Sequence, residues 1–84
     1  MIKKPVKIMI SDGLDARPIA MLVQVANQFE SEIYIESGTR KINAKSIMGM
    51  MTLGLDTGES VMVSADGADE ETAMKMVEAY LTDK

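Results

Sequence analysis

Two hydrophobic periods alternate along this chain of 84 residues, and their order constrains the fold more than any other feature. Apolar side chains recur at every second position in some segments, as in half-buried strands, and at three- and four-residue steps in others, as in helices. The pattern predicts strands at 6–10, 32–36, 40–43 and 61–65, and helices at 16–28 or 29, 46–52 and from Asp69 onward. The order βαββαβα, without a linker, predicts one two-layer α+β domain over residues 1–84.

The same periods predict which side chains form the core. We expect these apolar stripes to be buried: Val6, Ile8 and Ile10 in the first strand; Ile19, Leu22, Val23 and Ala26 in the first helix; Ala73, Val77, Tyr80 and Leu81 in the last. Pro5 is expected to open the first strand, because proline cannot donate to a sheet ladder. The lysines at 3, 4 and 7 are read as solvated flanks of that strand, and Asp69 as the cap of the last helix.

The first helix begins at a stretch that favours anions. In Gly13-Leu14-Asp15-Ala16-Arg17-Pro18, Asp15 is a good N-cap residue, and Pro18 falls in the first turn, where its missing N–H costs nothing. Free backbone N–H groups and the Arg17 side chain would face a negatively charged group. A capped helix behind a glycine turn is the plain structural interpretation of the same residues.

Composition excludes several classes of function. The net charge is −4 and no basic cluster is present, so direct nucleic-acid binding is not expected. The chain has no cysteine, which excludes disulfides and thiolate metal sites. Neither a bilayer-spanning apolar run nor a signal-peptide pattern is present, so we expect a cytoplasmic protein that does not bind a membrane. We expect no cofactor.

Three motifs resemble one family. Gly13 to Pro18 is similar to the Gly-(Ile/Leu)-His-Ala-Arg-Pro motif of HPr, the histidine-containing phosphocarrier of the bacterial sugar phosphotransferase system. Lys45-Ser46-Ile47-Met48-Gly49-Met50-Met51 resembles the regulatory-serine segment of its Gram-positive branch, and Asp66-Gly67-Ala68-Asp69-Glu70 resembles the run before its last helix. The resemblance covers nearly the whole chain. It implies an open-faced β-sandwich, in which three helices cover one face of a four-stranded antiparallel sheet.

The resemblance places the family's phosphorylated histidine at Asp15, and this chain contains no histidine. Its Crh-like branch also lacks that histidine, but carries glutamine there. Asp15 could accept a phosphoryl group as an acyl phosphate, imitate the charged carrier, or only cap the helix. Asp12 and Asp15 have the oxygens that Mg²⁺ prefers, yet a cation beside Arg17 and a helix N-terminus is repelled, so no metal is predicted.

Ser46 is the stronger candidate. On its own it reads as an N-cap, whereas the resemblance implies regulatory phosphorylation by a dedicated serine kinase/phosphorylase. The resemblance also implies an anion-binding pair at Ala16 and Arg17, and a docking surface formed by Arg17, Ala20, Ile47, Met48 and Met51. We therefore expect a non-enzymatic regulator of catabolite repression that binds a LacI-type repressor. Enzyme I and sugar-transport IIA domains are further candidate partners. The alternative function is a phosphoryl carrier of the phosphotransferase system, either through an acyl phosphate on Asp15 or as an active-site variant of an ordinary carrier.

Overall fold

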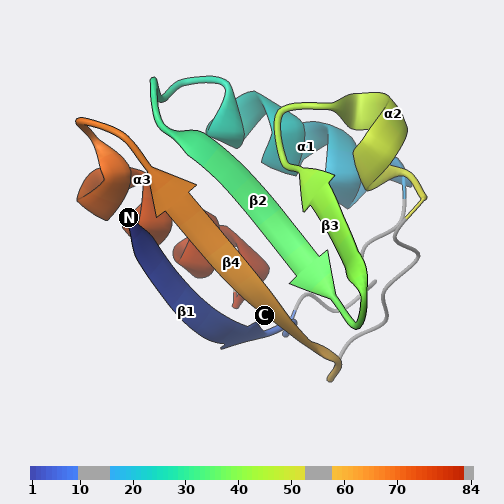
Figure 1. Cartoon of the computed structure of the whole chain (residues 1–84). Coiled ribbons are helices and arrows are strands. Elements are labelled where there is room, and N and C mark those ends of the chain that lie inside the picture. The colour runs from blue at the N-terminus through green and yellow to red at the C-terminus, as the bar shows by residue number, and fades with distance from the viewer. Residues whose placement is uncertain (10–15, 53–57, 83–84) are drawn as a thin grey trace.

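Four antiparallel strands form one sheet, and three helices lie on one of its faces in the computed structural model, which describes residues 1–9, 16–52 and 58–82 (Figure 1). The elements are β1 (Ile2–Lys7), α1 (Ala16–Ala26), β2 (Glu32–Ser37), β3 (Arg40–Asn43), α2 (Ile47–Met50), β4 (Ser60–Asp66) and α3 (Glu70–Leu81). The strands lie in the order β1-β4-β2-β3. This arrangement confirms the predicted fold class and element order.

Alternation along the strands separates a buried face from an open one. Val6 pairs with Val61, and Ile35 pairs with both Val63 and Ile42, so apolar side chains line up on the helix-covered side. The stripes predicted for the helices pack against them, and most of the predicted positions are buried: Val6, Ile8, Ile19, Leu22, Val23, Ala26, Ala73, Val77 and Leu81. Tyr80 is only partly buried, and its hydroxyl donates to the Pro18 carbonyl at 3.1 Å.

The predicted bounds of the first strand were wrong. β1 begins four residues earlier, at Ile2, so Pro5 lies inside it opposite Met62. Proline is tolerated there because β1 is an edge strand. The strand ends at Lys7, although the Ile8 N–H still donates to the Glu59 carbonyl at 2.8 Å. The next N–H, that of Met9, donates to the Leu81 carbonyl at 2.8 Å, which directs the chain toward the end of α3. Ile8 is still fully buried, whereas Ile10 lies outside the described residues.

Two of the three lysines taken as flanks are paired residues of the strand itself. Lys3 lies on the open face of the sheet, where its ammonium is 3.2 Å from Glu36. Lys4 points to the other face and reaches Glu78 of α3 at 2.8 Å. The two ion pairs attach the edge strand to β2 and to the helix layer.

Asp69 does not cap α3 through its side chain, contrary to the prediction. Its carboxylate accepts hydrogen bonds from the Glu30 N–H at 2.9 Å, and from the N–H and hydroxyl of Ser31 at 2.9 and 2.5 Å. These hydrogen bonds, with that from the Ser31 hydroxyl the largest cause, hold the pKa of Asp69 below its ordinary value. The carboxylate therefore joins the start of α3 to the segment that leads into β2.

Candidate functional site

The predicted site residues divide into those that the structure describes fully and those that it does not. Asp15 lies outside the described residues. Ala16 and Arg17 form the first positions of α1, but their side chains are outside the description. Anion binding by Ala16 and Arg17 therefore stays a prediction, and the geometry of the site is built from α2 and its surroundings.

Ser46 occupies the N-cap of α2. Its backbone is extended, with φ −102° and ψ 109°, and its hydroxyl accepts a hydrogen bond from the Gly49 N–H at 3.2 Å. The Ser46 carbonyl accepts from the Met50 N–H at 2.9 Å, which begins the helix. The structural role predicted for this serine is thus confirmed. The residue is also exposed, so its hydroxyl is accessible to a second protein.

Side chains from α1 and β3 fix the segment that leads into α2. The Asn43 side chain accepts from the Lys45 N–H at 2.8 Å, and the Asn27 amide donates to the Lys45 carbonyl at 3.4 Å. The Lys45 ammonium donates to the Phe29 carbonyl at 2.6 Å, just beyond the end of α1. A helix of one turn cannot hold itself together in water, so these contacts supply what local propensity does not.

The other end of α2 is held from β3. The Arg40 guanidinium donates to the Thr52 carbonyl at 2.7 Å and to the Thr52 hydroxyl. That hydroxyl donates in turn to the Gly49 carbonyl at 2.6 Å. Glycine at position 49 lets α2 lie close to β3, because a Cβ there would be only 3.1 Å from the Ile42 side chain. The role of Arg40 was not predicted from the sequence, because an arginine twelve residues before a threonine is not a recognisable motif.

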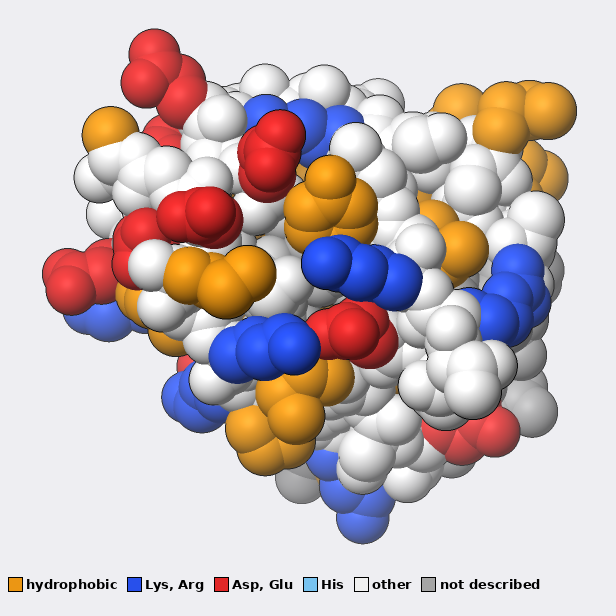
Figure 2. Space-filling model, in the orientation of Figure 1, with side chains coloured by type: hydrophobic (Ala, Val, Ile, Leu, Met, Phe, Trp, Pro, Cys, Tyr) orange, Lys and Arg blue, Asp and Glu red, His pale blue; other side chains and the backbone are white. Residues whose placement is uncertain are grey.

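Three apolar side chains of this segment face solvent. Ile47 is 45% exposed, Met48 77% and Met51 54%, whereas Met50 between them is fully buried. We call Ile47, Met48 and Met51 the α2 patch. Figure 2 shows hydrophobic side chains gathered at the edge of the molecule where α2 lies. Contiguous exposed apolar patches are found more often at protein-binding surfaces than elsewhere on a protein.

The α1 side of the predicted docking surface is partly described. Ala20 is half-buried on α1, and this helix contacts α2. Met21 is 47% exposed and was missed. Met21 follows Arg17 by four positions in the sequence, and this helical spacing is the signal that could have found it.

The described site has little chemistry of its own. The chain has no histidine or cysteine, so no general base of those types stands beside Ser46. Within 1–9, 16–52 and 58–82, no group of three acidic residues could hold a metal ion. In the same ranges, no helix is long and apolar enough to cross a membrane.

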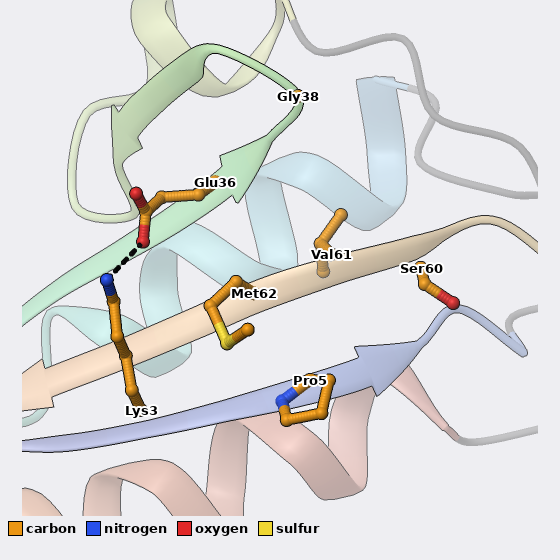
Figure 3. Close-up of a pocket in the computed structure, with 7 residues that line it drawn as sticks. All are labelled: Lys3, Pro5, Glu36, Gly38, Ser60, Val61 and Met62. Carbon is orange, nitrogen blue, oxygen red and sulfur yellow. Dashed lines mark ion pairs between the residues drawn. The ribbon is translucent and has the colours of Figure 1, made fainter.

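A shallow hollow of about 410 Å³ lies away from this site, on the open face of the sheet. Figure 3 shows Lys3 of β1 and Glu36 of β2 pointing toward one another across β4. Lys41 stands 4.6 Å from the centre of the Tyr34 ring on the same face. No sequence motif pointed to this hollow, because it forms only when β1 and β2 pair with opposite edges of β4.

Comparison with known proteins agrees with the fold and the motifs. The family model described as "PTS HPr component phosphorylation site" matches residues 2–83. The HPr-like protein Crh of Halalkalibacterium halodurans is 44% identical over 96% of both chains. Crh of Bacillus subtilis is 42% identical over the whole chain and 99% of its own. Its crystal structure, described as a dimer with a swapping domain, has a TM-score of 0.80 over 100% of this chain and 97% of that one. The phosphocarrier protein HPr of Bacillus anthracis has a TM-score of 0.92, with 41% identity over 95% of each chain.

Proposed function

The chain belongs to the HPr family of the phosphotransferase system, and on that basis we propose that it is a regulator of catabolite repression controlled by phosphorylation of Ser46. Family members are phosphocarrier or regulatory proteins. The relatives named Crh, which are matched over nearly their full length, favour the regulatory activity over the carrier activity. We further propose that residues 1–84 act as one domain, which the family match over 2–83 supports.

The observation that carries the proposal is the position of Ser46. An exposed hydroxyl stands at the first turn of α2, directly before the α2 patch. A phosphate there would add about −1.5 to −2 charge and three acceptor oxygens. Backbone N–H groups of a first helical turn have no acceptor inside the helix, so phosphate oxygens can accept from them. We therefore expect phosphorylation to change the surface and leave the fold intact.

The α2 patch supplies the second half of a recognition surface. A partner would bury Ile47, Met48 and Met51 and pair a cationic side chain with the adjacent phosphate. Apolar contact gives affinity, and the phosphate makes binding depend on the kinase. We propose a LacI-type catabolite-control repressor as this partner and an HPr serine kinase/phosphorylase as the enzyme. Arg17 and Ala20 on α1 are proposed to extend the surface.

The proposal assigns no phosphoryl transfer to Asp15. A carboxylate is a different nucleophile from imidazole, and productive transfer tolerates little displacement of the accepting atom. The enzyme I reaction distinguishes the two functions. Incubation with phosphoenolpyruvate and enzyme I should leave the chain unlabelled, and a hydroxylamine-sensitive label on Asp15 would support the carrier instead. The variant Asp15→His tests whether only the nucleophile is missing from the carrier surface.

The kinase assay tests the modification itself. The protein is incubated with ATP and an HPr kinase, and intact mass is measured alongside Ser46→Ala. We expect one added phosphate on the wild type and none on Ser46→Ala, with an HPr of known reactivity as the positive control. Thr72→Ala is a matched control, because Thr72 carries an exposed hydroxyl on α3 and is not among the residues that hold α2. An unmodified wild-type chain beside a modified control protein would overturn the proposal.

A further inference from the structure

We propose that Met48 and Met51 are oxidation sites, and that their conversion to methionine sulfoxide releases the partner bound at the α2 patch. The inference rests on the proposed docking function and adds to it a second, chemically different control. Phosphorylation of Ser46 would create the docking surface, and oxidation of the neighbouring thioethers would cancel it. Both modifications would act on one turn of helix.

Met48 and Met51 are the methionines of this segment that a dissolved oxidant can reach. Met48 is 77% exposed and Met51 54%, while Met50 in the same segment is fully buried. Oxidation of methionine by a dissolved oxidant follows access to the sulfur, because the oxidant must reach it from solvent. Met74 in the core is 5% exposed and serves as a second protected site. The chain has no cysteine, so no thiol competes for the oxidant.

The chemical step balances with a peroxide as the oxidant. The thioether sulfur gives an electron pair to one oxygen of hydrogen peroxide, and the oxygen–oxygen bond breaks as the sulfur–oxygen bond forms. The second oxygen departs as hydroxide, takes the proton from the transferred OH group, and leaves as water. Sulfur is oxidised, peroxide is reduced, and methionine sulfoxide reductases reverse the change.

The product opposes docking but not folding. A sulfoxide oxygen is a strong hydrogen-bond acceptor, and burying it under a partner without a donor costs free energy. The contacts that hold α2 do not use either side chain. They are the Ser46 cap on Gly49, the Arg40 hydrogen bonds to Thr52, and the buried Met50. The oxidised chain should thus remain folded while its apolar patch becomes polar.

The experiment starts from protein that already carries phosphate on Ser46, so that an effect on the kinase cannot be mistaken for an effect on docking. The phosphoprotein is treated with hydrogen peroxide, and peptide mass spectrometry follows each methionine. Circular dichroism checks the fold, and titration into the repressor gives Kd. We expect Met48 and Met51 to oxidise before Met50 and Met74, and Kd to rise at least about tenfold. Treatment with methionine sulfoxide reductases and a dithiol, which supplies the two electrons for each sulfoxide, should restore the original Kd.

A matched variant separates these sulfurs from all others. Met48→Leu/Met51→Leu keeps apolar side chains of similar volume. Met21 of α1 and Met76 of α3, which are 47% and 46% exposed, stay oxidisable in both proteins and report oxidation outside the α2 patch. The Kd of the double variant is measured before and after peroxide treatment, and the treatment should leave it at that variant's own starting value. An equal loss of binding in that variant would overturn the inference.

Two further outcomes are distinguishable. Oxidation of Met50 as early as Met48, or unchanged Kd in the oxidised wild type, would overturn this inference and leave the proposed function standing. Untreated phosphoprotein that does not bind the repressor would overturn the docking function and, with it, the inference.

Discussion

Asp69 shows how one side chain joins two distant parts of the fold. It lies at the start of α3, yet its carboxylate accepts from Glu30 and Ser31, 39 and 38 residues earlier in the chain. Gly67 stands against the same serine, since a Cβ on Gly67 would lie 2.6 Å from the Ser31 Cα. The α1–β2 connection and the β4–α3 connection are thereby fixed to one another.

Replacing Asp69 with asparagine should make stability less dependent on pH. Folding lowers the pKa of Asp69 from its ordinary 3.8. Its contribution to the free energy of unfolding is therefore present above that value and is lost as the pH falls through the lowered pKa. Asp69→Asn should melt below the wild type at pH 7, and the difference should shrink below pH 3.8. Thermal melts at both pH values test this, with the exposed Glu71→Gln as control; a constant difference would contradict it.

Gly67→Ala should destabilise the fold by overpacking. The added methyl would meet the backbone of Ser31, which cannot move without disturbing the hydrogen bonds to Asp69. The expected loss is about 1–3 kcal/mol of unfolding free energy, measured by urea denaturation. Gly38→Asn is the control, because Gly38 has φ +62° and open space around it, and asparagine tolerates that conformation. Equal stability of Gly67→Ala and the wild type would refute the close contact.

Among the elements, α2 is short, and its neighbours hold it in place. Its N-cap could be predicted, because serine before an apolar run is a local signal. Its attachments to Asn27, Lys45 and Arg40 could not, since they depend on where α1 and β3 lie. The error at β1 has the same origin. Alternation continues to Ile10 in the sequence, but the Met9 N–H bonds to the end of α3 instead of to a neighbouring strand, and alternation carries no sign of that contact.

Ser46 variants should separate capping from signalling. Ser46→Ala removes the acceptor for the Gly49 N–H and should cost about 0.5–2 kcal/mol of unfolding free energy. Ser46→Asp keeps a capping oxygen and should remain close to the wild type in urea denaturation. Neither variant should accept phosphate from the kinase. If Ser46→Ala were as stable as the wild type, the cap would contribute nothing to folding.

The buried and the exposed methionines of this segment should differ in what their truncation changes: stability for Met50, and repressor binding for Met48. Met50→Ala empties a fully buried site and should cost about 2–5 kcal/mol of unfolding free energy. Met48→Ala removes a side chain that is 77% exposed and should change stability by less than about 0.5 kcal/mol, while weakening repressor binding. Denaturation and binding measured on both variants test the assignment. Strong destabilisation by Met48→Ala would show that Met48 belongs to the core.

For the molecule as a whole, the hydrophobic pattern of the sequence determines the sheet layer and the helix layer. Contacts between residues distant in the sequence determine which apolar side chains stay exposed. The two periods sufficed to predict two layers and most of the core, because burial selects apolar residues position by position. The two periods do not predict which apolar residues stay exposed. Met48, Met50 and Met51 look alike in the sequence, and only the packing of α2 against α1 and β3 separates them. The hollow beside Lys3 and Glu36 likewise requires three strands in place.

In the proposed function, phosphate on Ser46 and the α2 patch together form one docking surface. Its most direct test is titration of a LacI-type catabolite-control repressor with phosphorylated and unphosphorylated protein at one salt concentration. The phosphorylated form should bind at least about tenfold more tightly, since a charge-assisted phosphate contact adds about 1.5–3 kcal/mol. Equal affinity of the two forms, with the phosphate verified by mass, would contradict the claim.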